Sequence, residues 1–151
     1  MYYEELPVGF SFSVPDVAVD REEMIAYSRR YNPSFIHVDE AAARETPFGD
    51  VIASGSFTEA LVNAEVVRTG ILTDHVVGGK SAYCEWYKPV LAGDVLSSRV
   101  TILDRHARHP DRGEIRVGID TWNQRGERVM HGEMRSVISA RHPLPPEELE
   151  C

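Results

Sequence analysis

Residues 31–55, YNPSFIHVDEAAARETPFGDVIASG, combine residue types that can carry out acid–base chemistry. The stretch has one histidine, His37, flanked by Asn32 and Asp39. A histidine exchanges protons near neutral pH, and catalytic side chains often lie on loops between rigid elements. Asn32-Pro33 should end a helix, because the residue before a proline avoids helical geometry. His37 is therefore expected to lie in a loop, where it could accept and return a proton.

A second candidate lies at the end of this stretch, where ASGSF places Gly55 at the start of a predicted long helix. The first N–H groups of a helix lack intrahelical partners and carry the positive end of the helix dipole. Such groups can polarise a carbonyl oxygen. Gly55 and its neighbours Ser54 and Ser56 are thus candidate substrate-binding residues. Structural roles compete with this interpretation, because His37 could be a core histidine and Gly55 a site of close packing.

The elements that must position these residues follow from local patterns. DREEMIAYSRRY begins with Asp20 as an N-cap and Glu23 three residues later, which is a capping-box pattern. DEAAARE predicts a second, short helix capped by Asp39. GSFTEALVNAEVVRTG predicts an amphipathic helix ending at Gly70. Its expected buried face consists of Phe57, Ala60, Leu61, Ala64 and Val67.

After Gly70 the apolar residues recur at every second position, which is typical of strands. SAYCEWYKPV, VLSSRVTIL, EIRVGIDTW and RVMHGEMRSVISA predict strands, with a turn at Gly93-Asp94, a loop at RHARHPDRG and a tight turn at NQRGE. Ile115, Val117 and Ile119 should share one face. The tail 141–151 carries three prolines and should be irregular. One long helix followed by antiparallel strands predicts a single α+β domain over residues 1–151, with the sheet wrapped around the helix.

Composition narrows the possible partners. The 151 residues are 42% hydrophobic and 26% charged, with a net charge of -8. This acidic balance argues against nucleic acid or an anionic membrane as partner. Cys84 and Cys151 form neither a disulfide framework nor a metal-ligand spacing, so no metal or other cofactor is expected. The N-terminus does not resemble a signal peptide and no stretch reaches the ~18 apolar residues of a membrane span, which favours a cytoplasmic protein.

Other patterns have structural explanations. DHVVGGKS resembles the end of a phosphate-binding loop but leads into a strand, where that motif requires a helix. His106 and His109 share a predicted loop with several arginines, and cationic neighbours oppose metal binding. His131 and Glu133 fit a cross-strand polar face. The aromatic residues of the first predicted strand are interpreted as core or interface residues: Tyr83, Trp86 and Tyr87.

Three blocks together resemble the MaoC-like dehydratases, which include the R-specific enoyl-CoA hydratases, on the hot-dog fold. The blocks are YNPSFIHVDEAAARETPFGDVIASG, EWYKPVLAGDVLSSRVTIL and IDTWNQRGERVMHGE, and they occur in the family's order over roughly residues 20–140. The resemblance implies an antiparallel sheet around a long central helix and a homodimer or higher homo-oligomer. It also implies a substrate held as a thioester of coenzyme A or of an acyl carrier.

The resemblance implies a lyase that hydrates an enoyl thioester or dehydrates a 3-hydroxyacyl thioester. His37 matches the family's catalytic histidine, and Gly55 matches the glycine whose N–H holds the thioester oxygen. The family's catalytic aspartate lies five residues before the histidine, where this chain has Asn32. An alternative alignment places that position on Arg30. Asn32 is kept as a catalytic-site residue that could hold a water or a substrate oxygen, and Asp50 is a candidate source of the missing carboxylate.

Because an amide cannot take a proton, modified chemistry in a biosynthetic pathway is also expected. Two alternatives stay open. One is a non-catalytic hot-dog subunit that binds an acyl thioester or completes a heterodimer. The other is a thioesterase, which is disfavoured because the motif order matches the hydratases and the long helix offers only Glu59 and Glu65 as carboxylates.

Overall fold

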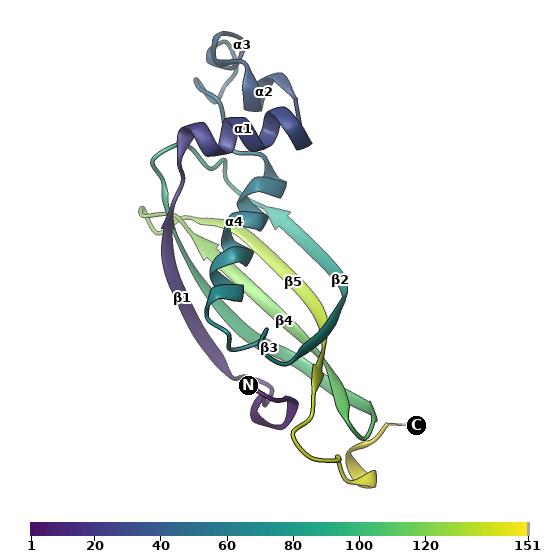
Figure 1. Cartoon of the computed structure of the whole chain (residues 1–151). Coiled ribbons are helices and arrows are strands. Elements are labelled where there is room, and N and C mark those ends of the chain that lie inside the picture. The colour runs from purple at the N-terminus through teal and green to yellow at the C-terminus, as the bar shows by residue number, and fades with distance from the viewer. Residues whose placement is uncertain (151) are drawn as a thin grey trace.

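The computed structural model describes residues 1–150 and shows a curved antiparallel sheet around one long helix (Figure 1). Cys151, expected as part of the irregular tail, lies outside the described residues. The strands are β1 (Ser11–Ala18), β2 (Val76–Trp86), β3 (Val95–His109), β4 (Arg112–Trp122) and β5 (Arg128–Ser139). Their order across the sheet is β1-β3-β4-β5-β2, so β1 and β2 form the two edges.

The helices are α1 (Arg21–Tyr31), α2 (Phe35–Val38), α3 (Glu40–Arg44) and α4 (Gly55–Arg68), with single 3-10 turns at Tyr3–Glu5 and Pro146–Glu148. Helices α1 to α3 gather beyond the N-terminal end of α4, whereas both chain termini lie near the opposite end of the sheet (Figure 1). The predicted caps are confirmed, because Asp20 accepts a hydrogen bond from the Glu23 N–H at 2.8 Å and Asp39 from the Ala42 N–H at 3.0 Å.

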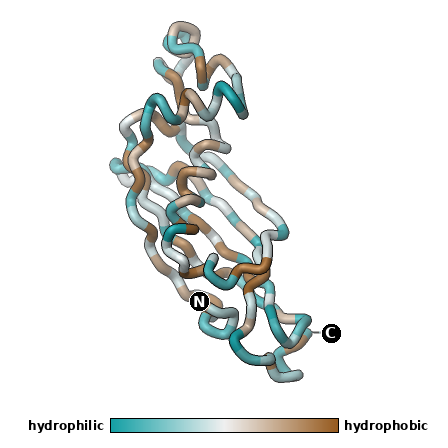
Figure 2. The backbone as a smooth tube through the Cα atoms, viewed as in Figure 1, coloured by the Kyte–Doolittle hydropathy of each residue, from teal (hydrophilic) through white to brown (hydrophobic). Residues whose placement is uncertain are grey.

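The core lies between α4 and the concave face of the sheet. The predicted alternation in β4 is confirmed, since Ile115, Val117 and Ile119 are 1%, 3% and 4% exposed. Hydrophobic and hydrophilic residues alternate along the strands in Figure 2, as expected for a sheet with one covered face. Burial of this apolar face holds α4 in place, and with it the start of the helix.

The predicted buried face of α4 is partly wrong. Phe57 is buried as expected, but Val67 is 46% exposed and the buried stripe continues through Thr58, Val62 and Val66. The helix carries apolar residues on nearly every side, so periodicity alone could not select the face that meets the sheet. The side that includes Val67 is left open in the protomer.

Two parts of the sheet also differ from what the sequence predicted. Strand β1 was not expected from the sequence, because Pro15 lies inside a register shift between Val14 and Val17 that interrupts the alternation. The segment predicted as the loop RHARHPDRG is instead mostly strand, because β3 continues to His109 and β4 starts at Arg112. The polar residues of this segment hide the alternation of apolar and polar residues by which a strand is predicted.

The aromatic residues of β2 are exposed and do not belong to the core. Tyr83 is 54% and Trp86 51% exposed, and both lie on a strand at the edge of the sheet. The valines and glycines of DHVVGGKS belong to β2, which confirms that this motif leads into a strand. Within residues 1–150, none of the helices has the length and apolar character needed to span a membrane.

Candidate active site

A cavity of about 460 Å³ opens between α2, the start of α4 and the chain that follows β2. Four of the five residues singled out in the sequence line it: Asn32, His37, Gly55 and Ser56. Trp86 forms another part of the wall. The fold therefore brings the acid–base candidate and the helix N-terminus to one cavity.

His37 lies in α2 and not in the expected loop, and its side chain is buried, with 8% exposed. Its Nδ1 lies 2.8 Å from the carbonyl oxygen of Ile52. A carbonyl can only accept, so Nδ1 carries the hydrogen, and in the neutral imidazole Nε2 then keeps its lone pair. The Ile52 N–H donates in turn to the Ile36 carbonyl at 3.0 Å. This pair of bonds holds the imidazole in one tautomer and one orientation.

Gly55 is the first residue of α4, after the N-cap Ser54. Ser54 Oγ accepts the Phe57 N–H at 3.2 Å, and the first helical bond runs from the Thr58 N–H to the Ser54 carbonyl. The N–H groups of Gly55 and Ser56 have no hydrogen-bond partner among residues 1–150. They are therefore available to an oxygen in the cavity, at the positive end of the helix dipole.

Trp86 explains why residue 55 is a glycine. The indole Nε1–H donates to the Gly55 carbonyl at 3.2 Å, so the ring lies against the first turn of α4. A Cβ on residue 55 would lie 2.4 Å from Cε2 of the ring. Close packing and substrate binding, which competed as interpretations of Gly55, are thus compatible: the absent side chain leaves space for Trp86 beside the exposed N–H groups.

Asn32 is the C-cap of α1, and its backbone N–H donates to the Ser28 carbonyl at 2.9 Å. Its side-chain amide forms no hydrogen bond with any residue the structure describes, although the residue lines the cavity. Ser54, by contrast, is fully buried and outside the cavity lining, with its Oγ engaged as the cap. Ser56 Oγ lies 3.4 Å from Ser54 Oγ.

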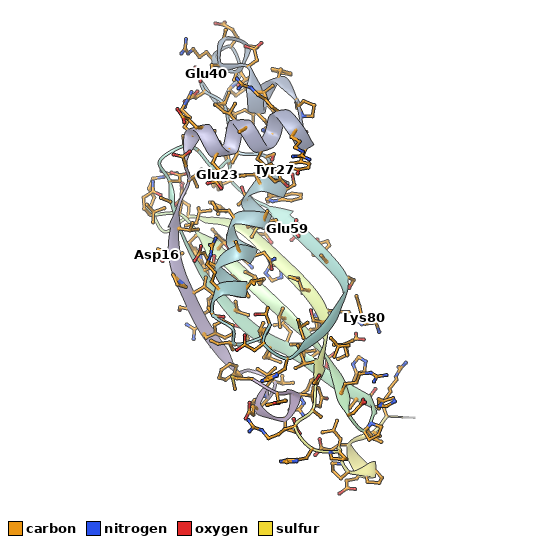
Figure 3. All side chains as sticks on the ribbon, viewed as in Figure 1. Asp16, Glu23, Tyr27, Glu40, Glu59 and Lys80 are labelled. Atoms are coloured by element: carbon orange, nitrogen blue, oxygen red, sulfur yellow. The ribbon has the colours of Figure 1, made fainter. Side chains whose placement is uncertain are left out.

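No aspartate or glutamate of residues 1–150 lines this cavity. Asp50, the candidate replacement carboxylate, receives two bonds from Arg21 at 2.7 and 2.8 Å. These bonds from the guanidinium, together with the Val51 N–H, lower the pKa of Asp50 to about 2. Glu59 projects from α4 toward the β2 side of the sheet (Figure 3), and Glu65 pairs with Arg68. The structure therefore gives Asp50 the role of anchoring α1.

Several cavity residues were not singled out as site residues in the sequence. Trp86 was interpreted only as a core or interface aromatic, and Lys88, Thr58 and Phe48 received no role. Lys88 adds a cation to the lining. A glycine at a helix start facing an exposed aromatic is a pairing that only the tertiary structure reveals, because Gly55 and Trp86 are 31 positions apart.

The other polar residues considered in the sequence lie outside this cavity. His131 Nδ1 is 2.9 Å from Asp120 and Nε2 is 3.5 Å from Glu133, which confirms the predicted cross-strand polar face. Cys84 is partly buried, and burial raises the pKa of its thiol to about 11. Across the described chain, residues 1–150, no group of three or more His, Cys, Asp and Glu side chains is arranged to hold a metal ion.

Comparison with known proteins identifies the fold and the family. The structure is similar to that of the MaoC-like dehydratase from Rhodospirillum rubrum, with 32% identity, a TM-score of 0.86, and coverage of 95% of this chain and 99% of that one. It is also similar to the R-hydratase PhaJ1 from Pseudomonas aeruginosa, with 23% identity, a TM-score of 0.68, and coverage of 96% and 94%. At this lower identity the second similarity shows a shared fold, and the predicted hot-dog fold is confirmed.

The sequence is also similar to that of an uncharacterised protein, YdeM, from Bacillus subtilis strain 168. The two chains are 27% identical over 139 residues, which cover 91% of this chain and 99% of the relative. The family model described as MaoC like domain matches residues 7–123. Those residues contain every position that lines the cavity, and the chain therefore belongs to the MaoC-like domain family.

Proposed function

We propose that this protein adds water to a 2-enoyl thioester or removes water from the corresponding 3-hydroxyacyl thioester. One observation carries the proposal: His37, with Nε2 left unbonded, and the free N–H groups at the start of α4 line the same cavity. Membership of the MaoC-like family supports a hydratase or dehydratase. The thioester would be carried by coenzyme A or by an acyl carrier.

In the hydration direction, His37 Nε2 would remove a proton from a water molecule as the water oxygen bonds to the β-carbon. The electron pair of the carbon–carbon double bond moves toward the thioester carbonyl, whose oxygen gains negative charge. The N–H of Gly55 stabilises that charge. The imidazolium then returns its proton to the α-carbon, which restores His37 and completes the addition of one water.

Asn32 would hold the attacking water, because its amide can donate and accept hydrogen bonds but cannot take the proton. The cavity also lacks an aspartate or glutamate, among residues 1–150, to balance the imidazolium charge. We therefore expect hydration to be slow in the wild-type protein. Asn32→Asp should raise it by roughly tenfold or more, which needs only ~1.4 kcal/mol of transition-state stabilisation.

The test is hydration of crotonyl-CoA and of a medium-chain enoyl-CoA. The reaction is monitored through the loss of the enoyl absorbance. His37→Ala should reduce turnover to below about a tenth of wild type, since a general acid–base group contributes roughly 100-fold or more. Ser34→Asp is the matched control for Asn32→Asp, because it adds a carboxylate to the same loop outside the cavity lining. Fast wild-type hydration that Asn32→Asp slows would show that Asn32 belongs to a working site and refute the idea that it replaces a lost carboxylate.

A second candidate function is a non-catalytic acyl-thioester-binding subunit, alone or in a heterodimer. The absence of any carboxylate from the cavity lining within residues 1–150 favours it. In that case enoyl-CoA should bind with no turnover in wild type or in Asn32→Asp. The same absence also weighs against a thioesterase, for which no carboxylate is placed to act as base; release of free thiol from acyl-CoA would reverse that judgement.

We also propose that the protein is at least a homodimer. Strand β2 lies at the edge of the sheet and leaves Val76, Val77 and Tyr83 exposed, which a second copy would cover. Light scattering at micromolar concentration should give at least twice the 17.0 kDa of one chain. Val77→Lys should weaken association, whereas Val8→Lys should not, because Val8 is equally exposed at 59% but precedes β1, which lies at the opposite edge of the sheet from β2. A monodisperse protomer in wild type would contradict the proposal.

A further inference from the structure

A second cavity of about 250 Å³ lies at the end of the sheet remote from His37. Side chains from β2, β3 and β4 line it, among them Lys80, His106, Arg108, Arg112 and Glu114. Lys80 extends from β2 away from α4 (Figure 3). Strand residues alternate between faces, so Glu114 points away from the α4-covered face on which Ile115 is buried. The cavity is therefore on the opposite side of the sheet from the candidate active site.

Position along β2 separates the two cavities further. Trp86 lines the first and Lys80 the second. Six strand residues span roughly 20 Å. The second cavity is thus not an extension of the cavity that holds His37, and no part of the proposed hydration reaction uses its side chains.

The charges around this cavity do not balance. Glu114 is 8% exposed and pairs with Lys80, with Arg135 at 3.4 Å and with His106 at 3.8 Å. The Lys80 ammonium is the main cause of the lowered pKa of Glu114, which keeps this carboxylate charged. Asp111, at the strand turn, pairs with His109 and Arg112. The permanent cations here are Lys80, Arg108, Arg112 and Arg135, and the carboxylates are Glu114 and Asp111.

The four permanent cations therefore exceed the two carboxylates by two, even with both histidines neutral. Arg108 makes no ion pair or hydrogen bond with any residue in 1–150, although it lines the cavity. The protein as a whole carries a net charge of -8, so a local excess of cations is opposite to its general character. A charge network that served only to pair Glu114 and Asp111 would not need Arg108.

We propose that this cavity binds the phosphoryl group of a small molecule. A phosphate monoester carries a charge of roughly -1.5 to -2 at neutral pH, which matches the excess of two cations. The guanidinium groups of Arg108 and Arg112 present paired N–H donors that suit phosphate oxygens. His106 and His109 add ring nitrogens to the lining. A volume of 250 Å³ corresponds to about eight water molecules, at about 30 Å³ for each, so it can admit a phosphoryl or diphosphoryl group.

Calorimetric titration tests the proposal with two probes, inorganic pyrophosphate and ADP, which separate a free phosphate from a nucleotide-borne one. Saturable binding of either, at one site per protomer, is expected. Arg108→Gln should weaken it by about tenfold or more, equivalent to ~1.4 kcal/mol. Arg99→Gln is the matched control, because Arg99 is on the same strand but contacts Ser11 outside the cavity. Lys88→Gln, which removes the cation that lines the first cavity, should bind the probes like wild type, which separates this site from the proposed active site.

Three results would overturn the inference. The first is that neither probe gives a saturable signal at millimolar concentration. The second is that Arg99→Gln and Arg108→Gln reduce affinity equally, since that would mean diffuse attraction to the surface. The third is that citrate binds as tightly as pyrophosphate and ADP, which would mean a site for polyanions without preference for phosphoryl groups. Thermal unfolding of Arg108→Gln without ligand provides the check that the variant is folded.

Discussion

The contact between Gly55 and Trp86 makes a strong prediction about Gly55→Ala. The new methyl carbon would lie 2.4 Å from Cε2 and 2.7 Å from Cζ2 of the indole. Carbon atoms pack best at roughly 3.5–4.0 Å, so the ring must retreat by about 1 Å or more. Trp86 is half exposed and can move outward, which means that the substitution should displace the cavity wall and leave the protein folded.

The effects on stability should nearly cancel. Displacing the ring breaks the bond from Trp86 Nε1 to the Gly55 carbonyl, which contributes about 1 kcal/mol. Alanine in place of glycine favours a helix by up to about 1 kcal/mol. The free energy of unfolding should therefore change by less than about 1 kcal/mol, whereas a displacement of about 1 Å near the reacting atoms can reduce turnover by about 100-fold.

The assay combines hydration kinetics with tryptophan emission. The chain has two tryptophans, so a Trp122→Phe background leaves Trp86 as the sole reporter of ring movement. Gly79→Ala is the matched control, because residue 79 lies on β2 like Trp86 and a methyl carbon there would have no heavy atom within 4 Å. If Gly55→Ala keeps both wild-type emission and wild-type turnover, the ring does not pack against the helix start as described, and residue 55 does not need to be a glycine.

Two further predictions concern the supports of the site. Ser54→Ala removes the cap of α4, in which Ser54 Oγ accepts the Phe57 N–H, and should lower the free energy of unfolding by about 1 kcal/mol in urea denaturation; an unchanged midpoint would contradict the capping role. Asp50→Asn should cost no more than about 1 kcal/mol, because Asp50 and Arg21 are both partly exposed. The pKa of Asp50 is lowered from 3.8 to about 2, so its contribution is present above 3.8 and is lost as pH falls through about 2. The stability difference between wild type and Asp50→Asn should thus shrink over that interval, and a constant difference would refute this assignment.

Local signals predicted the parts of the fold that depend on neighbouring residues. Asp20 and Asp39 cap their helices as expected, because a cap joins residues only three positions apart. Ile115 and Val117 lie in a strand with one covered face, where apolar and polar residues alternate strictly. This alternation predicts their burial from the sequence alone. His37 and Gly55 were selected as candidates in the same way, since a lone histidine and a glycine at a helix start are local features, and the structure places both at one cavity.

The parts that failed depend on contacts between distant segments. Pro15 and the register shift around it hide β1, whose pairing with β3 joins residues far apart in the chain, such as Ser11 and Thr101. The buried side of α4 is decided by which strands it meets, so Val67 looked like core and is exposed. Asp50 looked like a free carboxylate because nothing local shows that Arg21 reaches it across 29 positions.

The missing carboxylate limits how the proposed reaction can proceed. A carboxylate about 4 Å from an imidazolium stabilises it by roughly 4 kcal/mol at an effective dielectric constant of about 20. With Asn32 in the cavity, the imidazolium of His37 lacks that support, and Lys88 in the same lining opposes a second positive charge. The negative charge on the thioester oxygen, held by the Gly55 N–H, is then the counterion that the reaction itself supplies. In the proposed reaction, proton transfer to His37 should therefore accompany formation of that oxyanion, and Gly55 would contribute more to catalysis than it would beside an aspartate.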